Sequence, residues 1–407
     1  MARSFRNVLI VSAVVFAGLL GITAIGSFAG RDQSLKAAPQ NDQTLGGAPT
    51  GLFDCKFPDL RGEKSYDVNR YWGGFPKEFD ASNYKAPAWV LGPFTKSPAN
   101  PVLEPTPGGW DRGQSVSGGG VHAGAVVVVN GKFYYVYRGE RDLDRKPGYV
   151  CDIGVATSGD GVHFTKDTEH SPFFRRGEDS KYSFEDVSLV RFKDTFYLFC
   201  NRWDYSRLND PKVSGAFLAT SKDLRHWTKR GLLFPQAKET HRNPAILQNP
   251  QNEAVKVNDK FVMYINNGII AYSDDLLHWT SKKVAHPWPG GENCFALVDW
   301  SEKYPDSILV FTGGNHSGHF YAIGEVLLDR SHPEKALEWV PRPVFCAESN
   351  FPWEDGKAAR PPHAHISDWP DTTWFSALTR YKGQWWMYYA GSEVYTCLAT
   401  APASGPK

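Results

Sequence analysis

A two-part pattern recurs along the chain and limits its fold more than any other feature. Each copy has a short aromatic run that is opened by a turn, followed by a second apolar run. In the three clearest copies this second run ends in a Ser-x-Asp phrase. The copies lie at residues 131–164, 193–227, 258–279, 307–329 and 382–401. A single aromatic hairpin cannot bury both of its faces. Repetition every ~50–75 residues therefore predicts an all-β fold, a five-bladed β-propeller with a central funnel.

Composition agrees with a large β-protein and excludes one class of partner. The 407 residues include 14 Trp, 18 Tyr and 25 Phe, which favour strands and a large core. Lys and Arg number 45 against 44 Asp and Glu, so no basic field exists to attract nucleic acid. The length would allow two domains, but the blades of one ring form a single unit. We therefore expect residues 51–407 to form one catalytic propeller domain.

The N-terminal segment differs from the rest of the chain. Arg3 and Arg6 precede the apolar stretch 8–25, and Ser27-Phe28-Ala29 offers a cleavage site. This order predicts a signal peptide over residues 1–29, or a membrane-anchoring helix if it is not cleaved. The polar residues 30–50 are expected to be a flexible tether. We therefore expect an exported protein, periplasmic or extracellular, with a membrane tether as the alternative.

The cysteines do not suggest a metal site. The six cysteines show no Cys-x-x-Cys pair and no metal-type spacing, so we expect no metal ion or other cofactor. An oxidising compartment would permit disulfides, but spacing alone does not define their pairing. Cys200 and Cys397 lie in or beside strand-like runs and are expected to be buried thiols.

Two other features are interpreted as scaffold. The segment 89–105 precedes the first full repeat, and we expect it to supply a strand that closes the ring against the last blade. Ser and Asp in the Ser-x-Asp-x-x-His-Trp phrases favour tight turns. Trp227 and Trp279 of these phrases are expected to pack between blades.

Inner strands of a propeller begin at the funnel, so polar residues just before such strands are site candidates. The stretch 118–126 is rich in glycine, which permits close approach of a ligand, and His122 would meet that ligand. The alternative is a flexible turn with a solvated histidine.

A second candidate is the adjacent pair Glu185 and Asp186, directly before an apolar strand. Side chains of neighbouring strand residues point to opposite faces, so one carboxyl would face the funnel. A carboxyl beside apolar walls has a raised pKa, which suits a general acid. An ordinary hydrogen-bonded turn is the alternative.

Two further loops carry many donors and acceptors. One contains Lys238, Glu239, His241, Arg242 and Asn243, and would otherwise be a solvated charged loop. The other candidates are two histidine pairs, which we expect to contact sugar or anion rather than metal because no third ligand is visible. They are His316 with His319, and His363 with His365.

No nucleophile elbow, phosphate-binding loop, His-Glu-x-x-His or dinucleotide fingerprint is present. Aromatic residues with paired carboxylates therefore indicate carbohydrate chemistry.

Several phrases along the chain carry a resemblance to a known family. They are NPVLEP at 100–105, Tyr137-Arg138, IGVATSGDGVHF at 153–164, EDVSL at 185–189, 327–345, Glu354-Asp-Gly356 and Tyr388-Tyr389-Ala-Gly-Ser-Glu393. The chain resembles the five-bladed propeller glycosidases, most closely the β-mannoside phosphorylases and β-mannosidases of glycoside hydrolase family 130. The similarity covers most of residues 95–401, and the order of the matching phrases carries it.

The resemblance implies roles for individual residues. Asp186 would be the catalytic acid, Arg138 would bind the sugar or the attacking group, and Glu393 would bind a sugar hydroxyl. EDVSL lacks the Pro-Arg that follows the acid in most members, and Asn266 or Asn267 replaces an expected basic residue. Phosphorylases need several cations to hold phosphate, so these departures favour hydrolysis.

The resulting hypothesis is a glycoside hydrolase that acts on an oligosaccharide or polysaccharide, with β-mannosides as the suggested class. Asp186 would protonate the glycosidic oxygen, and Glu239 or Glu393 would activate water. Glu185 would contact the substrate. The alternatives are a non-catalytic carbohydrate-binding propeller, a phosphorylase on the same scaffold, and the propeller enzymes that cleave arabinan, xylan or fructan.

Overall fold

The computed structural model describes ten segments of the chain, and the account below concerns only these. They are residues 86–112, 120–141, 150–174, 182–285, 288, 292–315, 321–340, 343–348, 350–355 and 372–403. The expected signal or anchor at 1–29 and the tether at 30–50 lie outside them. No helix within the described segments is long and apolar enough to cross a membrane.

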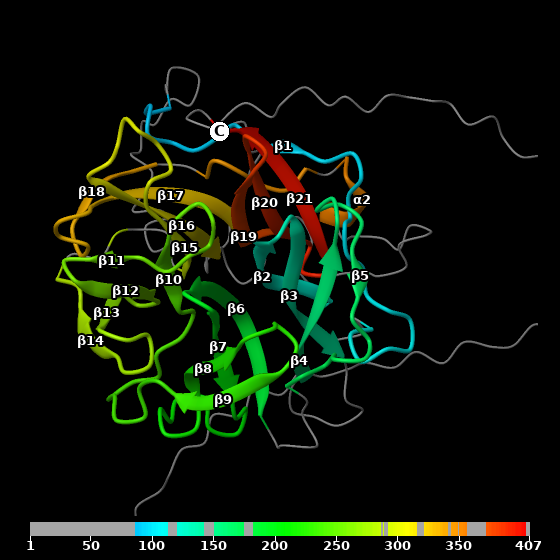
Figure 1. Ribbon diagram of the computed structural model, residues 1–407, viewed down its shortest axis with the longest axis horizontal. Helices are drawn as coiled ribbons and strands as arrows, with labels where there is room; N and C mark the ends of the chain where they lie inside the picture. The colour runs from blue at the N-terminus through cyan, green and yellow to red at the C-terminus, as the bar shows by residue number, and fades with distance from the viewer. Residues whose placement is uncertain are drawn as a thin grey trace, which may run out of the picture. The chain divides into compact units, whose positions relative to one another are not determined.

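The described chain is all-β. Its one α-helix is the four-residue α2 (Pro352–Asp355). Two four-stranded antiparallel sheets follow one another along the chain (Figure 1). The first contains β2 (Val121–Val129), β3 (Lys132–Arg141), β4 (Val150–Ser158) and β5 (Thr165–Lys166). The second contains β6 (Ser183–Phe192), β7 (Thr195–Trp203), β8 (Gly215–Ser221) and β9 (Trp227–Leu232).

A nine-stranded sheet contains two successive antiparallel meanders. The first has β10 (Ala245–Gln248), β11 (Lys256–Val257), β12 (Lys260–Ile265), β13 (Ile269–Ser273) and β14 (Thr280–Lys283). The second has β15 (Glu292–Leu297), β16 (Ser307–Asn315), β17 (Tyr321–Asp329) and β18 (Ala336–Trp339). Parallel pairing of β10 with β15 joins the two meanders.

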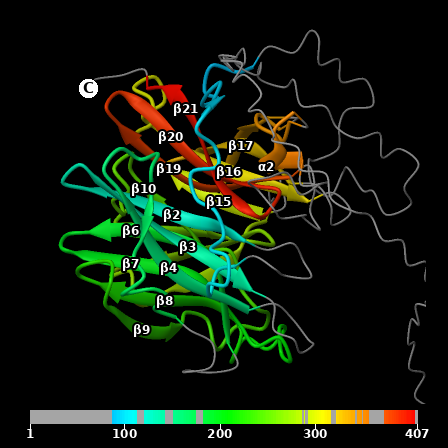
Figure 2. The ribbon, with the colours of Figure 1, turned by 90° about the vertical axis from the view of Figure 1, so that its right-hand side faces the viewer.

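The last sheet combines the two ends of the described chain. It contains β19 (Thr373–Tyr381), β20 (Gln384–Gly391), β21 (Tyr395–Pro402) and the early strand β1 (Thr95–Lys96), which pairs with β21. Figure 2 shows the early segment, in blue, running past β21. Asn100 extends the closure, because its side chain exchanges hydrogen bonds with the Leu398 backbone at 2.7 and 3.0 Å. The predicted closing role of segment 89–105 is confirmed.

The first strands of the meanders form a closed circle. β2 contacts β6, β6 contacts β10, β10 pairs with β15, β15 contacts β19, and β19 returns to β2. Figure 1 shows these strands around the centre of the fold. The architecture is therefore propeller-like, and the beginnings of distant strands meet at one place.

Aromatic contacts between sheets make the scaffold. Trp227 stacks on Phe173 with ring centroids 5.3 Å apart, and Trp279 meets the edge of Phe199 at 5.9 Å. Each pair links one meander to the next, which confirms the interpretation of both tryptophans as scaffold. Cys200 and Cys397 are free and buried, as the sequence predicted.

Candidate active site

Bulges near the start of the innermost strands direct side chains to the centre. The pairing register shifts between His122 and Ala125 in β2 and between Glu185 and Ser188 in β6. A bulge adds a residue to one strand and re-aims the neighbouring side chains. Asp186 has φ of +53°, a left-handed conformation that is costly for a residue with a side chain.

This geometry corrects one expectation. We predicted that Glu185 and Asp186 would point to opposite faces, as on a regular strand. Both instead line the same cavity, because the bulge interrupts the alternation.

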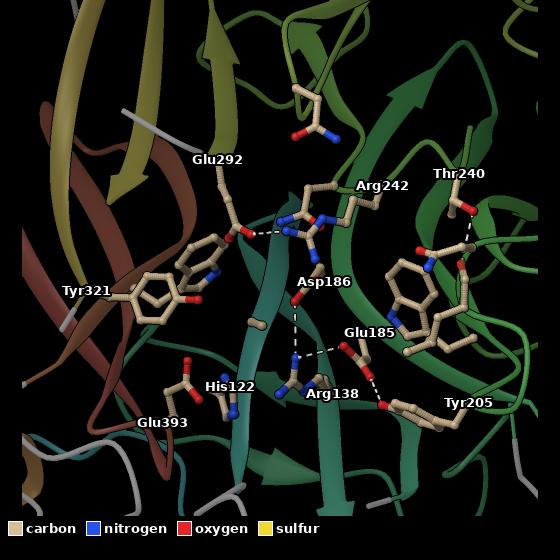
Figure 3. Close-up of a pocket in the computed structure, with 17 residues that line it drawn as sticks. His122, Arg138, Glu185, Asp186, Tyr205, Thr240, Arg242, Glu292, Tyr321 and Glu393 are labelled. Atoms are coloured by element: carbon tan, nitrogen blue, oxygen red, sulfur yellow. Dashed lines mark hydrogen bonds and ion pairs between the residues drawn. The ribbon is translucent and has the colours of Figure 1, made fainter. Parts of the chain in front are cut away.

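The cavity has a volume of about 480 Å³, within the range of small-ligand sites. Figure 3 shows side chains from several meanders pointing into it. Among the described residues, the charged lining consists of four carboxylates and two guanidinium groups. They are Glu185, Asp186, Glu292, Glu393, Arg138 and Arg242.

Asp186 lies centrally in this view and is held through both carboxylate oxygens. Arg138 Nη1 lies 3.1 Å from Oδ1, and Asn201 Nδ2 donates to Oδ2 at 2.7 Å. Asn201 also donates to Asn243 Oδ1 at 2.8 Å and accepts from the Asn243 backbone N–H at 2.8 Å. Asn201 thus fixes Asp186 and Asn243 together. It was not among the predicted residues, although it directly follows the aromatic run 193–200 within β7.

Arg138 is the common ion-pair partner of three carboxylates, Glu140, Glu185 and Asp186. It pairs with the buried Glu140, and its Nη1 lies 3.6 Å from Glu185 Oε2. The Tyr205 hydroxyl donates to Glu185. Burial raises the pKa of Glu185 to about 7, against the opposing effect of Arg138. Glu140 was also missed, because a buried carboxyl that supports an arginine has no distinct sequence pattern.

Glu292 is a carboxylate of the cavity that the sequence analysis did not identify. It begins β15, and Arg242 Nη2 lies 3.2 Å from its Oε1 (Figure 3). Burial raises the pKa of Glu292 to about 7, Arg242 opposes the rise, and the charge of Asp186 adds to it. The start of an inner strand was the available signal. Glu292 was not predicted because each repeat, as defined from the sequence, begins at the second strand of a meander and so does not include the first strand.

Glu393 and His122 lie on the same side of the cavity (Figure 3). Gly120 allows this, because a Cβ there would lie 2.0 Å from the Val394 carbonyl oxygen. The glycine-rich stretch therefore serves close backbone packing at this position. Burial raises the pKa of Glu393 to about 8.

His122 is buried, and neither ring nitrogen has a hydrogen-bond partner among the described residues. Burial, then the charge of Arg138, lowers its pKa well below 6.5. A neutral imidazole can donate one hydrogen bond and accept another, so His122 is suited to a hydroxyl group.

Three predicted residues do not line the cavity. Lys238 and Glu239 are exposed, and Glu239 Oε1 lies 4.0 Å from Lys283 Nζ. The prediction that Glu239 is the water-activating base is therefore wrong, because Glu239 does not line the cavity. His241 is buried against the Phe234 ring, and its Nε2 lies 2.9 Å from Ser281 Oγ, so its role is structural. The adjacent Arg242 and Asn243 do line the cavity.

The remaining histidine candidates are not located. His316 and His319, and likewise His363 and His365, lie outside the described residues. No group of three or more potential metal ligands occurs in the part of the chain that the structure describes.

Comparison with known proteins bears on the fold. No protein-family model matches the chain. A glycosyl hydrolase from Bacteroides ovatus is similar over 79% of this chain and 97% of its own, at 23% identity and a TM-score of 0.63. A second similar structure belongs to the GH130 family of mannoside phosphorylases, which contains glycoside hydrolases that target β-1,2-mannosidic linkages in Candida mannan. It matches over 79% of this chain and 97% of its own, at 21% identity and a TM-score of 0.63.

β-1,2-Mannobiose phosphorylase from Listeria innocua, in complex with β-1,2-mannobiose, is also similar. It matches over 76% of this chain and 97% of its own, at 17% identity and a TM-score of 0.57. The predicted resemblance is therefore confirmed at the level of the fold.

Proposed function

We propose that the protein is a glycoside hydrolase built on five propeller blades, and that it cleaves uncharged oligosaccharides, with β-mannosides as the substrate class. The observation that carries the proposal is the meeting of Asp186 and Glu292 in one cavity, each at the start of an inner strand. Two carboxylates around a sugar-sized space are the usual machinery of glycoside hydrolysis. The fold shared with known glycosidases and phosphorylases supports this assignment.

In the proposed mechanism Asp186 is the acid and Glu292 the base. Asp186 gives its proton to the glycosidic oxygen, directly or through a sugar hydroxyl, as the bond from the anomeric carbon to that oxygen breaks. A water molecule attacks the anomeric carbon and loses its proton to Glu292. The products are the free sugar and the shortened chain. Activation of water by a second carboxylate predicts inversion at the anomeric carbon.

The charge of the cavity supports hydrolysis over phosphorolysis. Phosphate binding requires free cations that can form charge-assisted hydrogen bonds. Four carboxylates line this cavity, and both arginines already have acidic partners. Phosphate or a uronic acid would therefore meet arginines that are already paired with carboxylates, whereas a neutral sugar needs no free cation.

The neutral hydrogen-bonding groups on one side of the cavity would hold the sugar whose bond is cleaved. His122 would contact one hydroxyl of that sugar, and Glu393 another. The raised pKa of Glu393 keeps this carboxyl protonated in part at neutral pH. It would then donate as well as accept, as sugar hydroxyls require.

Asp186→Asn tests the proposal most directly. The amide has no proton to give, so kcat on β-mannobiose should fall by at least ~100-fold, while circular dichroism stays that of the wild type. Turnover should not depend on added phosphate. Unchanged turnover would remove Asp186 from the mechanism, and sugar 1-phosphate formation would indicate a phosphorylase. Sugar binding by calorimetry without any product would indicate a binding protein.

We also retain export as part of the proposal, because residues 1–29 carry the pattern of a signal peptide or anchor. Mass spectrometry of the protein recovered from the cell exterior or periplasm would give its first residue and separate cleavage from anchoring. Recovery only in the cytoplasm would contradict it.

A further inference from the structure

One wall of the cavity comes from a loop to which sequence analysis assigned no role. The loop 204–214 connects β7 to β8 and contributes Tyr205, Leu208 and Asn209 to the lining, next to Trp203 at the end of β7. Figure 3 shows Tyr205 across the cavity from Tyr321 and Glu393.

Internal hydrogen bonds fix the shape of this loop. The buried Asp204 accepts from Ser206 Oγ at 2.6 Å and from Arg207 Nε at 3.3 Å. Its backbone N–H donates to Ser214 Oγ at 3.0 Å, which ties the two ends of the loop together. Thr240 Oγ1 donates to the Leu208 carbonyl oxygen at 3.0 Å and connects the loop to the segment that carries Arg242. A surface braced in this way is preorganised, so binding a ligand there orders little additional chain.

The two sides of the cavity differ in depth. His122 is 2% exposed and Trp374 is 8% exposed, so both side chains lie deep in the cavity. Leu208 is 39% exposed, so the loop side opens to solvent. A sugar seated against His122 would therefore lie at the deep end of the cavity. In the proposed binding mode the rest of the saccharide extends from this sugar past Asp186 toward the exposed loop.

We infer that loop 204–214 is the binding platform for the leaving-group sugar and determines preference for saccharide leaving groups. The inference rests on the proposed function. Leu208 offers an apolar surface to the C–H face of the sugar, while Tyr205 combines a ring face with a hydroxyl that is held on Glu185. Apolar walls with a few fixed polar groups are typical of specific ligand sites.

The experiment compares two substrates that share the cleaved sugar. β-Mannobiose places a sugar on the loop, whereas β-mannosyl azide has a small leaving group that does not reach it. In Leu208→Ala, kcat/KM for mannobiose should fall on the order of tenfold, and kcat/KM for the azide should stay within about twofold. Leu277→Ala is the matched control, because Leu277 is 37% exposed and lies outside the cavity.

A second pair of variants separates the ring of Tyr205 from its hydroxyl. Tyr205→Phe keeps the ring and should leave the ratio of the two kcat/KM values unchanged, even if both values fall. Tyr205→Ala should lower the ratio. An equal effect of Leu208→Ala on both substrates, or no effect, would overturn the inference. Wild-type enzyme that turns over neither substrate would instead reject the proposed function.

Discussion

At the scale of single residues, burial dominates the chemistry of the cavity. It is the largest cause of the raised pKa of Glu185, Glu292 and Glu393, and the nearby arginines only moderate it. Values of about 7 for Glu185 and Glu292 place these carboxyls where small changes in surroundings alter their protonation. A base must be ionised to accept a proton, so the activity of Glu292 should rise as pH increases through about 7.

Arg242→Gln should move the acidic limb of the kcat/KM profile to higher pH. Arg242 stabilises the ionised form of Glu292, so its removal raises the pKa of Glu292 further. Arg242 is about half exposed, and we expect a shift near the low end of the range for an adjacent charge, about one pH unit.

The pH profile between 5 and 9 measures this shift, with ~0.5-unit steps around the limb. Arg330→Gln is the control, because Arg330 pairs with Asp299 outside the cavity. A limb that stays in place or moves to lower pH would rule out Glu292 as the base that the profile reports.

At the scale of elements, the two-residue strand β1 provides a buried lysine that connects it to two later segments of the chain. Lys96 Nζ is buried and lies 2.6 Å from Glu354 Oε2, 3.1 Å from Glu348 Oε1 and 2.8 Å from the Cys346 carbonyl oxygen. The Tyr389 hydroxyl donates to Glu354 Oε1 at 2.6 Å. One lysine thus connects β1 to α2, and Tyr389 connects α2 to β20. Glu354, which belongs to one of the phrases that resemble family 130, therefore helps to hold β1 against the last sheet.

Lys96→Met should destabilise the fold strongly. It leaves the fully buried Glu354 carboxyl without its cation, and breaking a buried pair on one side costs about 3–5 kcal/mol. Urea unfolding followed by circular dichroism measures the loss. Lys260→Met removes a pair with Asp274 in which both side chains are largely exposed, so its free energy of unfolding should change by less than about 1 kcal/mol. Equal effects of the two variants on the free energy of unfolding would show that the Lys96–Glu354 pair does not stabilise the fold more than an exposed pair does.

At the scale of the whole described fold, neighbouring meanders share their cores. One buried cluster joins Trp89 of the early segment with Phe311 of β16 and Tyr389 of β20. Another joins Val136 of β3 with Leu198 of β7. A sheet that lost its neighbour would expose apolar surface on both sides, so no meander is expected to unfold by itself.

Unfolding of this part of the chain should therefore be one cooperative transition. Tryptophan fluorescence and far-UV circular dichroism should give coincident urea curves, and Lys96→Met should shift both curves together. Two separated transitions, or a fluorescence change that precedes the loss of strand signal, would contradict the shared core.

Much of the fold was determined by local sequence. Aromatic runs with turn residues predict strands, and their repetition predicts a ring, because every copy needs a neighbour to cover its second face. A closing strand from segment 89–105 and the packing of Trp227 and Trp279 between blades were also predicted, and the structure places that strand at 95–96. At the site, His122 and Asp186 were predicted because they lie where inner strands begin, and Arg138 was predicted from the family resemblance.

Only the tertiary structure decided which of these side chains meet. The bulge in β6 brings Glu185 and Asp186 to one side, against the alternation of a regular strand. Asn201, Glu140 and Glu292 belong to the site because distant strands converge at the centre. Glu239 is excluded because it is exposed beside Lys283 and does not line the cavity. Strand formation depends on neighbours in sequence, whereas cavity membership and pKa depend on burial and charge contributed across the ring.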